Sequence, residues 1–227
     1  METFRRFEKK YLLDRNQARQ LLQLLKDRIK PDKFYQTDIR SIYYDTKNFQ
    51  LIRRSIEKPK YKEKLRVRSY GEATGNDKVF VELKKKFDGI VYKRRTKAAC
   101  DDVLNDIYSA SFKDPQVGKE MLYALNYYEK LQPKIFIGCQ RTSYTGIEDE
   151  DLRITFDDHI VYRLNHLSLQ SSEYDKDLTD KIVMELKIKE AMPLWLADAL
   201  DKVKAYPQGF SKVGTAYTKE LKRSITL

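Results

Sequence analysis

Several segments of this 227-residue chain alternate charged residues with apolar ones. In residues 62–68 the cations occupy the even positions, with Leu65 and Val67 on the other side, and Glu82 and Glu185 lie on the charged side of two similar segments. Side chains of a β-strand point alternately to its two faces, so each segment predicts one charged and one apolar face. A single charged face is typical of the solvated side of a sheet. Five segments that repeat a mixture of Glu with Lys or Arg indicate a binding surface instead.

The residue types on these faces suit phosphate chemistry. Arg binds phosphate oxygens through a planar, bidentate guanidinium group, and Lys supplies a point charge. Cations that share a cavity repel one another, and a linear phosphate chain supplies the balancing charges in a row. Carboxylates would repel that chain unless a divalent cation lay between, so the acidic residues predict Mn²⁺ or Mg²⁺. Phosphoryl transfer depends mainly on positioning and charge neutralisation, and requires no Ser or Cys nucleophile.

The same periodicities predict the elements that carry these faces. Alternation with period two predicts eight strands, over residues 4–12, 38–45, 61–70, 79–86, 90–96, 134–144, 152–157 and 181–189. Helical spacing predicts helices over residues 14–30, 101–130 (with a turn near Asp114-Pro115) and 193–204. Turn signals occur at Asn76-Asp77 and at Asp88-Gly89, which predicts a hairpin. We therefore expect an α+β fold: a closed eight-stranded antiparallel β-barrel that forms a tunnel, with helices packed outside.

Composition limits the classes of partner. The net charge of +11 and the pI near 9.4 favour polyanions: nucleic acid, an anionic membrane or phosphate chains. No apolar run approaches the ~20 residues of a membrane span, and the first ten residues are too charged for a signal peptide. Two cysteines make no disulfide framework. We expect one continuous cytoplasmic domain over residues 1–227, without a membrane span and without a nucleic-acid partner; the oligomeric state stays open.

Taken in order, these segments resemble a known family. Residues 7–11, 41–45, 65–71, 79–84, 141–144, 152–157, 184–187 and 210–212 resemble the triphosphate tunnel metalloenzymes of the CYTH-like superfamily. Within that superfamily the chain is most similar to the VTC domain, a polyphosphate polymerase module. The matching segments follow the family's order and span nearly the whole chain.

The resemblance implies roles for the matching positions. The residues that would grip the triphosphate and the growing chain are Arg66, Arg68, Lys84, Lys93, Arg141, Arg153 and, from the first strand, Lys10. Glu185 would hold the metal, and Lys212 would lie near the tunnel mouth. Lys187 is added because it shares a face with Glu185. Glu8 and Glu82 complete the metal candidates, because they are acids among cations.

One departure from the family pattern separates the candidate reactions. The first-strand motif E-x-E-x-K has Arg6 in place of its first acid, which favours polymerase over hydrolase. We therefore expect transfer of the γ-phosphoryl group of ATP to a growing inorganic polyphosphate chain. Two alternatives stay open: a metal-dependent triphosphatase that hydrolyses inorganic triphosphate or a nucleotide, and a non-catalytic module that binds polyphosphate or another polyanion.

Overall fold

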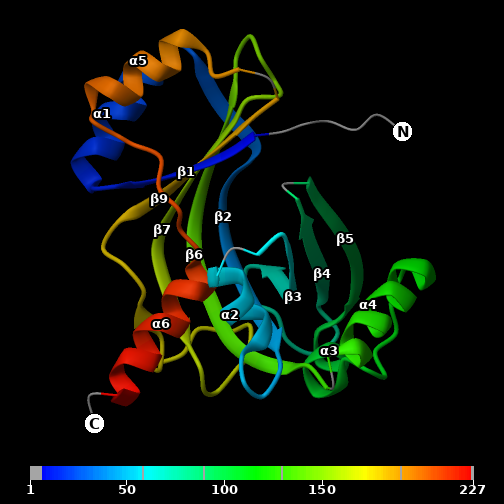
Figure 1. Cartoon of the computed structure of the whole chain (residues 1–227). Coiled ribbons are helices and arrows are strands. Elements are labelled where there is room, and N and C mark those ends of the chain that lie inside the picture. The colour runs from blue at the N-terminus through cyan, green and yellow to red at the C-terminus, as the bar shows by residue number, and fades with distance from the viewer. Residues whose placement is uncertain (1–6, 58, 89, 129, 190, 226–227) are drawn as a thin grey trace. The chain divides into compact units, whose positions relative to one another are not determined.

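The chain alternates strands and helices along its length (Figure 1). The computed structural model describes residues 7–57, 59–88, 90–128, 130–189 and 191–225. Within them the elements are β1 (Phe7–Leu13), α1 (Arg15–Leu25), β2 (Ile29–Asp45), α2 (Gln50–Glu57), β3 (Tyr61–Tyr70), β4 (Lys78–Phe87), β5 (Ile90–Ala99), α3 (Cys100–Asp106), α4 (Pro115–Tyr127), β6 (Gln132–Gly146), β7 (Arg153–Arg163), β8 (Lys176–Asp177), β9 (Ile182–Ile188), α5 (Leu194–Lys202) and α6 (Lys212–Ile225). The predicted α+β class is confirmed. Over the described residues, the structure has no helix whose length and apolar content would let it cross a membrane.

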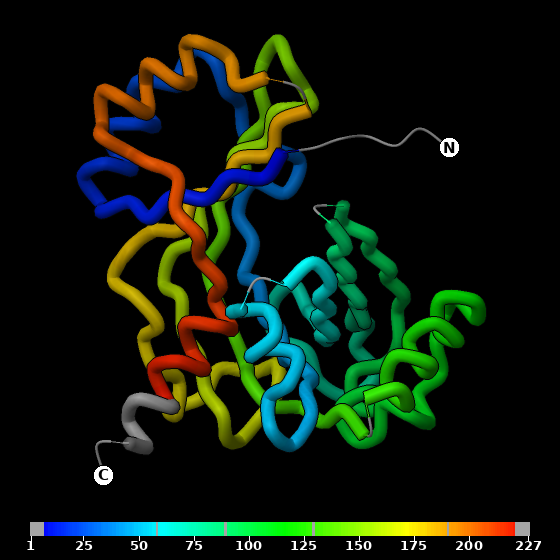
Figure 2. Tube along the Cα trace, viewed as in Figure 1, coloured from blue at the N-terminus to red at the C-terminus, as the bar shows by residue number. Residues whose placement is uncertain are grey.

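The chain forms two compact units, each assembled from three separate segments (Figure 2). Unit 1 takes its described residues from 1–38, 139–160 and 179–210. Unit 2 takes them from 39–138, 161–178 and 211–227. Strands β2, β6 and β7 contribute one part to each unit. The expectation of one continuous domain stays a prediction.

In unit 1 the strands follow the order β1-β9-β7-β6-β2, and helices α1 and α5 pack on one face of this sheet (Figure 1). Helix α1 begins at a capping box, in which the Asp14 side chain accepts from the Gln17 backbone N–H at 2.7 Å. Leu21 of α1 and Leu200 of α5 share a core with Leu186 of β9. Because side chains alternate along a strand, the charged residues between the apolar ones point to the opposite face.

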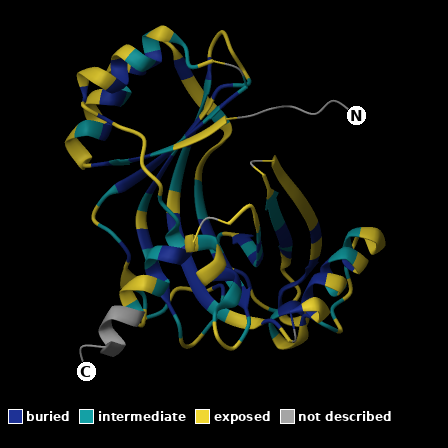
Figure 3. Ribbon diagram, viewed as in Figure 1, coloured by how far each residue is buried: buried dark blue, intermediate teal, exposed yellow. Residues whose placement is uncertain are grey.

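In unit 2 the strands follow the order β7-β6-β2-β3-β4-β5, and the two-residue strand β8 pairs with β7. Buried residues of β3 and β4, such as Leu65 and Val81, form one core with Val103 of α3 and Leu125 of α4. Figure 3 colours the buried parts of the ribbon dark blue. Here too, the residues that alternate with the buried ones point away from the helices. The β4–β5 turn contains Asp88 at a φ of 44°, as the predicted hairpin requires; Gly89 lies outside the described residues.

Most predicted strands are confirmed, while several helix bounds are corrected. Strand 61–70 matches β3 at both ends, and the described parts of the other seven lie within a few residues of the prediction except for β2, which begins at Ile29, and β7, which continues to Arg163. The helix predicted over 14–30 ends at Leu25, because Ile29 belongs to β2 although its spacing fits the apolar stripe of the helix. Pro193 is the N-cap of α5 and lies outside the helix. Helices α2 and α6 and strand β8 were not predicted.

The predicted closed barrel is not confirmed. The hydrogen-bonded strand order is open, with β1 and β5 at its two ends and no ladder between them in the described residues. Closure by hydrogen bonds requires every strand to have two neighbours. Residues 90–95 of β5 are exposed, as expected for an edge strand.

Candidate functional site

Unit 2 carries a face that is almost entirely basic. We call it the basic face: the outward residues of β3, β4 and β5 in the rows between Lys62 and Arg68. Antiparallel pairing places these residues directly opposite one another. Nine of its ten charged side chains are cations, namely Lys62, Lys64, Arg66, Arg68, Lys84, Lys86, Lys93, Arg95 and Lys97, and the tenth is Glu82. The alternation predicted from sequence is confirmed here for β3, where residues 62–68 alternate between half-buried and buried.

One row of the basic face contains only lysines. Lys64 lies opposite Lys84, and Lys84 lies opposite Lys93, so three ammonium groups cross three neighbouring strands. Like charges directly opposite each other in a sheet are destabilising. Such a row is stabilised when a bound anion with several charges lies across it.

Glu82 is the centre of the next row. Its side chain is only 1% exposed, and its carboxylate lies 2.7 Å from Arg66, 2.9 Å from Lys93, 3.1 Å from Arg95 and 4.0 Å from Arg68. Burial raises the pKa of the Glu82 carboxyl, but Arg66, Arg68 and Lys93 outweigh it and hold the pKa at about 2. The carboxylate is therefore ionised at neutral pH and fixes four cations in place. Because cations surround it, its geometry favours an ion-pair role over the metal ligation predicted from sequence.

Strand β2 extends the basic face with two hydroxyl groups. Tyr43 lies opposite Arg66, which donates from Nη1 to the Tyr43 hydroxyl oxygen at 3.0 Å. Ser41 lies opposite Arg68, which donates from Nε to Ser41 Oγ at 3.1 Å. Burial raises the pKa of Tyr43, but the neighbouring Arg66, Arg68 and Lys64 outweigh it and lower the pKa to about 7. The row thus includes a phenol that ionises near neutral pH.

Unit 1 carries a second charged face, on which acids and bases are mixed. We call it the mixed face: the outward residues of β1, β9, β7 and β6 in this unit. Its charged residues are Glu8, Lys10, Arg141, Arg153, Asp157, Glu185 and Lys187. Pairing places Lys10, Glu185 and Thr155 in one row, and Glu8, Lys187 and Arg153 in the next.

Glu185 pairs with two lysines of the mixed face. Its carboxylate lies 2.9 Å from Lys187 Nζ and 3.8 Å from Lys10 Nζ. Lys10 Nζ is also 3.5 Å from Glu8, so this ammonium group lies between two carboxylates. Burial raises the pKa of the Glu185 carboxyl, but Lys187, Lys10 and Arg141 lower it to about 2. Glu185 is therefore an anion throughout the neutral range.

Arg141 is held by a buried partner. Asp157, whose side chain is 1% exposed, accepts two hydrogen bonds from the Arg141 guanidinium group, at 2.5 and 2.7 Å. This bidentate pairing fixes the plane and direction of the guanidinium group. Arg141 is consequently a rigid cation that also interacts electrostatically with Glu185.

The oxygen donors of the mixed face fit a divalent cation that takes some of its ligands from the protein and the others from a phosphate. In the described residues, no three His, Cys, Asp or Glu side chains gather closely enough to hold a metal by themselves. Thr155, opposite Glu185, has a buried hydroxyl oxygen with no hydrogen-bond partner among the described residues. Mg²⁺ and similar hard cations use one or two carboxylates together with substrate phosphates. Glu185 and Glu8, with the Thr155 hydroxyl, match that donor set.

The predicted site residues fall into two groups. The basic face brings together Arg66, Arg68, Lys84 and Lys93, and the mixed face brings together Glu8, Lys10, Arg141, Arg153, Glu185 and Lys187. Lys212 is the first residue of α6, next to Ser211, whose hydroxyl accepts from Lys64 Nζ at 3.1 Å. Sequence reasoning missed Arg95, although its alternation with Lys93 and Lys97 signalled a shared face. It also committed to no role for Tyr43 or Thr155, whose partners only strand register identifies.

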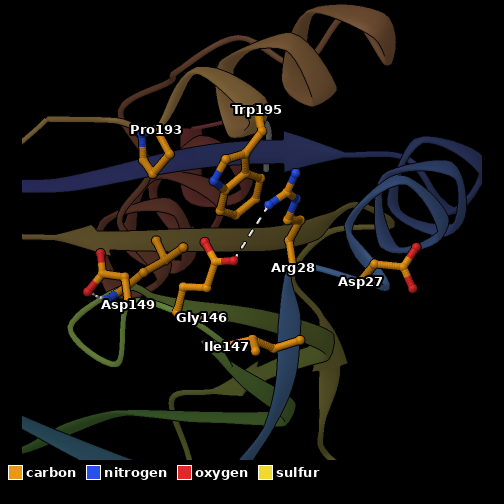
Figure 4. A pocket seen from close by; sticks show the side chains of 9 residues that line it. Asp27, Arg28, Gly146, Ile147, Asp149, Pro193 and Trp195 are labelled. Carbon is orange, nitrogen blue, oxygen red and sulfur yellow. Dashed lines mark hydrogen bonds and ion pairs between the residues drawn. The ribbon is translucent and has the colours of Figure 1, made fainter.

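A small cavity in unit 1 is a weaker candidate (Figure 4). Its volume is about 60 Å³, and it is lined by Asp27, Arg28, Gly146, Ile147, Glu148, Asp149, Leu152, Pro193 and Trp195. Arg28 lies 4.0 Å from Glu148 at its rim. None of the predicted site residues lines this cavity, and its volume suits a few water molecules.

Comparisons with known proteins concern the family and the fold of the chain. The family model described as VTC domain matches residues 5–220 of the chain. A putative adenylate cyclase from Bacillus halodurans is similar in structure, with a TM-score of 0.55 and 14% identity over 90% of this chain and 92% of that one. A putative adenylyl cyclase from Hippeastrum, described as having a dominant triphosphatase activity, gives a TM-score of 0.53 and 14% identity over 95% and 96%. Likeness at this identity shows a shared fold. Among curated proteins, none matches the chain.

Proposed function

The chain belongs to the VTC domain family, as its sequence predicted, and we propose that it is a metal-dependent polyphosphate polymerase. It transfers the γ-phosphoryl group of ATP to the end of a growing inorganic polyphosphate chain. The basic face binds phosphate groups, and the mixed face supplies the carboxylates for Mn²⁺ or Mg²⁺.

The observation that carries the proposal is the lysine row of the basic face. Lys64, Lys84 and Lys93 lie opposite one another, beside a row in which Glu82 holds Lys93 and three further cations. A single small anion balances only part of this charge. A chain of linked phosphates, with a negative charge on each unit, balances the row along its length.

The residues divide the work of phosphoryl transfer between them. Arg66 and Arg68, fixed by Glu82 and by the β2 hydroxyl groups, orient non-bridging phosphate oxygens and neutralise charge that develops on them. On the mixed face Arg141, fixed by Asp157, does the same. Glu185, Glu8 and Thr155 would hold the divalent cation, which when bound supplies further charge neutralisation at the phosphates.

Two rival functions predict different products. A triphosphatase, the activity described for the Hippeastrum protein, transfers the phosphoryl group to water and releases orthophosphate. A non-catalytic module binds phosphate chains without turnover. The mixed face argues against pure binding, because the carboxylates of Glu8 and Glu185 repel a polyanion unless a cation accompanies it.

The test is an incubation of purified protein with ATP, Mn²⁺ and a short polyphosphate primer, with products resolved on a gel stained for polyphosphate. We expect a ladder of long chains for the wild type and for Glu150→Ala, an exposed acid outside both faces. Glu185→Ala should abolish the ladder. Orthophosphate as the sole product would replace the polymerase with a triphosphatase. Bound polyphosphate without turnover would leave a binding module.

A further inference from the structure

Tyr43 lies at the end of the row that contains Glu82. The Tyr43 hydroxyl oxygen is 3.0 Å from Arg66 Nη1, and the guanidinium carbon is 5.8 Å from the centre of the Tyr43 ring. The other side of the same guanidinium group is bound to Glu82, through Nε and Nη2 at 2.7 Å. Arg66 is therefore shared between a carboxylate and a phenol, and its orientation depends on both.

The charged groups that act most strongly on the Tyr43 hydroxyl are cations. Arg66, Arg68 and Lys64 approach from β3 and together lower the pKa of Tyr43 to about 7, although burial raises it. Glu82 of β4 acts through Arg66. Strand β6, the other neighbour of β2, carries Lys134, whose Nζ lies 5.0 Å from the centre of the Phe49 ring. This surrounding charge stabilises a phenolate in the absence of substrate.

We propose that Tyr43 is a proton-accepting phosphate ligand of the basic face. In the free protein its phenolate is a counter-ion of Arg66; when a phosphate chain binds, the phenolate takes up one proton and then donates a hydrogen bond to a phosphate oxygen. The proton comes from solvent and forms the phenol O–H bond, and no bond to phosphorus forms or breaks in this step. The inference rests on the proposed function, because it takes a phosphate chain as the ligand.

Electrostatics give the direction in which phosphate binding changes the protonation of Tyr43. The incoming phosphates replace the phenolate as the counter-ion of Arg66 and repel its negative charge, so binding raises the pKa of Tyr43 above about 7. Below that pH Tyr43 is already protonated and binding takes up no proton at this site. Above it, each bound chain takes up as much as one proton, and this group alone weakens binding by up to about tenfold per pH unit.

The first experiment examines the free protein. Ultraviolet absorbance of phenolate is followed from about pH 5.5 to 9 in the wild type, in Tyr43→Phe and in Tyr206→Phe, an exposed tyrosine of unit 1. We expect a transition near pH 7 in the wild type and in Tyr206→Phe that Tyr43→Phe lacks. Tyr70, whose pKa Arg95 lowers against burial, contributes equally to all three curves. Identical curves for the wild type and Tyr43→Phe would overturn the proposal.

The second experiment measures the proton taken up on binding. Tripolyphosphate is titrated calorimetrically into the wild type and into Tyr43→Phe at about pH 8, in two buffers of different ionisation enthalpy. We expect the wild type to take up close to one proton more than the variant; protonation of tripolyphosphate itself cancels in the comparison. Tight binding with equal proton uptake would overturn the role of Tyr43 and leave the proposed function standing. Absence of tripolyphosphate binding in both would overturn the proposed function and this inference with it.

Discussion

The basic face of unit 2 and the mixed face of unit 1 are built alike but charged differently. Both consist of outward residues of antiparallel strands whose inward residues join an apolar core. Yet the basic face has nine cations and one carboxylate, whereas the mixed face has four cations and three carboxylates. On the basic face, Glu82 fixes the surrounding cations in place. On the mixed face, Lys10 and Lys187 form ion pairs with the carboxylate of Glu185.

This difference shows that a carboxylate among cations can have either of two roles. A single buried acid with four cations around it organises positive charge for an anionic ligand. Two acids that flank a lysine, as Glu8 and Glu185 flank Lys10, can instead hold a divalent cation in the position of the ammonium group. Each of the following changes tests whether the two faces differ in this way.

The largest effect is expected from Glu185→Gln on the mixed face. Turnover with Mn²⁺ should fall by roughly 100-fold or more, because an amide cannot replace the charge of a metal-holding carboxylate. Binding of tripolyphosphate without metal should stay within a few-fold of the wild type. Steady-state kinetics and metal-free binding measure the two quantities. Equal loss of both would remove the distinction between the faces.

Glu82→Gln should act on folding and spare the metal. Removing the buried carboxylate deprives Arg66, Lys93 and their neighbours of the counter-ion that they share, which should lower the free energy of unfolding by about 3 kcal/mol. Tripolyphosphate should restore more stability to the variant than to the wild type, because it supplies the missing negative charge. Thermal unfolding with and without tripolyphosphate measures this. A raised Mn²⁺ requirement without loss of stability would return Glu82 to the metal site.

The pH dependence of stability gives a related test. The pKa of Glu82 falls from its ordinary 4.5 to about 2 on folding, so its stabilisation is present above about pH 4.5 and is lost as pH falls toward 2. The wild type should therefore exceed Glu82→Gln in Tm by a margin that shrinks as pH is lowered from 5 to 2.5. The contribution of Glu185 is common to both proteins and cancels. A margin that stays constant would contradict the ionised carboxylate.

Lys84→Ala should weaken binding of polyphosphate by about tenfold and reduce the dependence of log Kd on log salt by nearly one unit. Lys84 is the middle lysine of its row, so its loss removes the central one of three charges that a bound phosphate chain would neutralise. Lys119→Ala, on the exposed side of α4, is the matched control. If both variants gave the same salt dependence, the row would be a solvated surface.

The smallest effect is expected from Thr155→Val. The change removes a buried hydroxyl group that lacks a partner in the described part of the chain, so stability should be unchanged or slightly raised. The Mn²⁺ concentration for half-maximal turnover should rise several-fold, because a ligand oxygen is lost. Titration of activity with Mn²⁺, beside thermal unfolding, separates the two. An unchanged Mn²⁺ requirement would limit the metal's protein ligands to carboxylates.

Alternation along a strand was enough to predict which residues share a face. It did not predict which strands pair or in which register. Lys62 to Arg68 and Glu185 to Lys187 read directly as charged faces because period two is a local property. The contact between Tyr43 and Arg66 depends on the pairing of β2 with β3, and that between Thr155 and Glu185 on the pairing of β7 with β9. Residues so far apart in sequence leave no local signal of their contact.

The missed helix α2 has a similar cause. Its first turn is held by Asp45, the last residue of β2, which accepts hydrogen bonds from the backbone N–H groups of Leu51 and Ile52 at 2.9 and 2.8 Å. Sequence reasoning read Asp45 as the end of a strand and assigned it no further role. The open strand order was missed for another reason: strand number alone favours a barrel, and closure depends on a pairing that no single segment encodes.

The interleaving of the two units has a consequence for synthesis of the chain. Unit 1 joins residues near the N-terminus to residues near 185, as in the pairing of Lys10 with Glu185. Until the ribosome has made residues 182–188, β1 therefore lacks its partner strand β9. The hairpins of unit 2 from β3 to β5, in contrast, pair neighbours in sequence and can form early. The basic face is thus assembled first and the mixed face last, so a nascent chain presents its clustered cations before the carboxylate of Glu185 is in place.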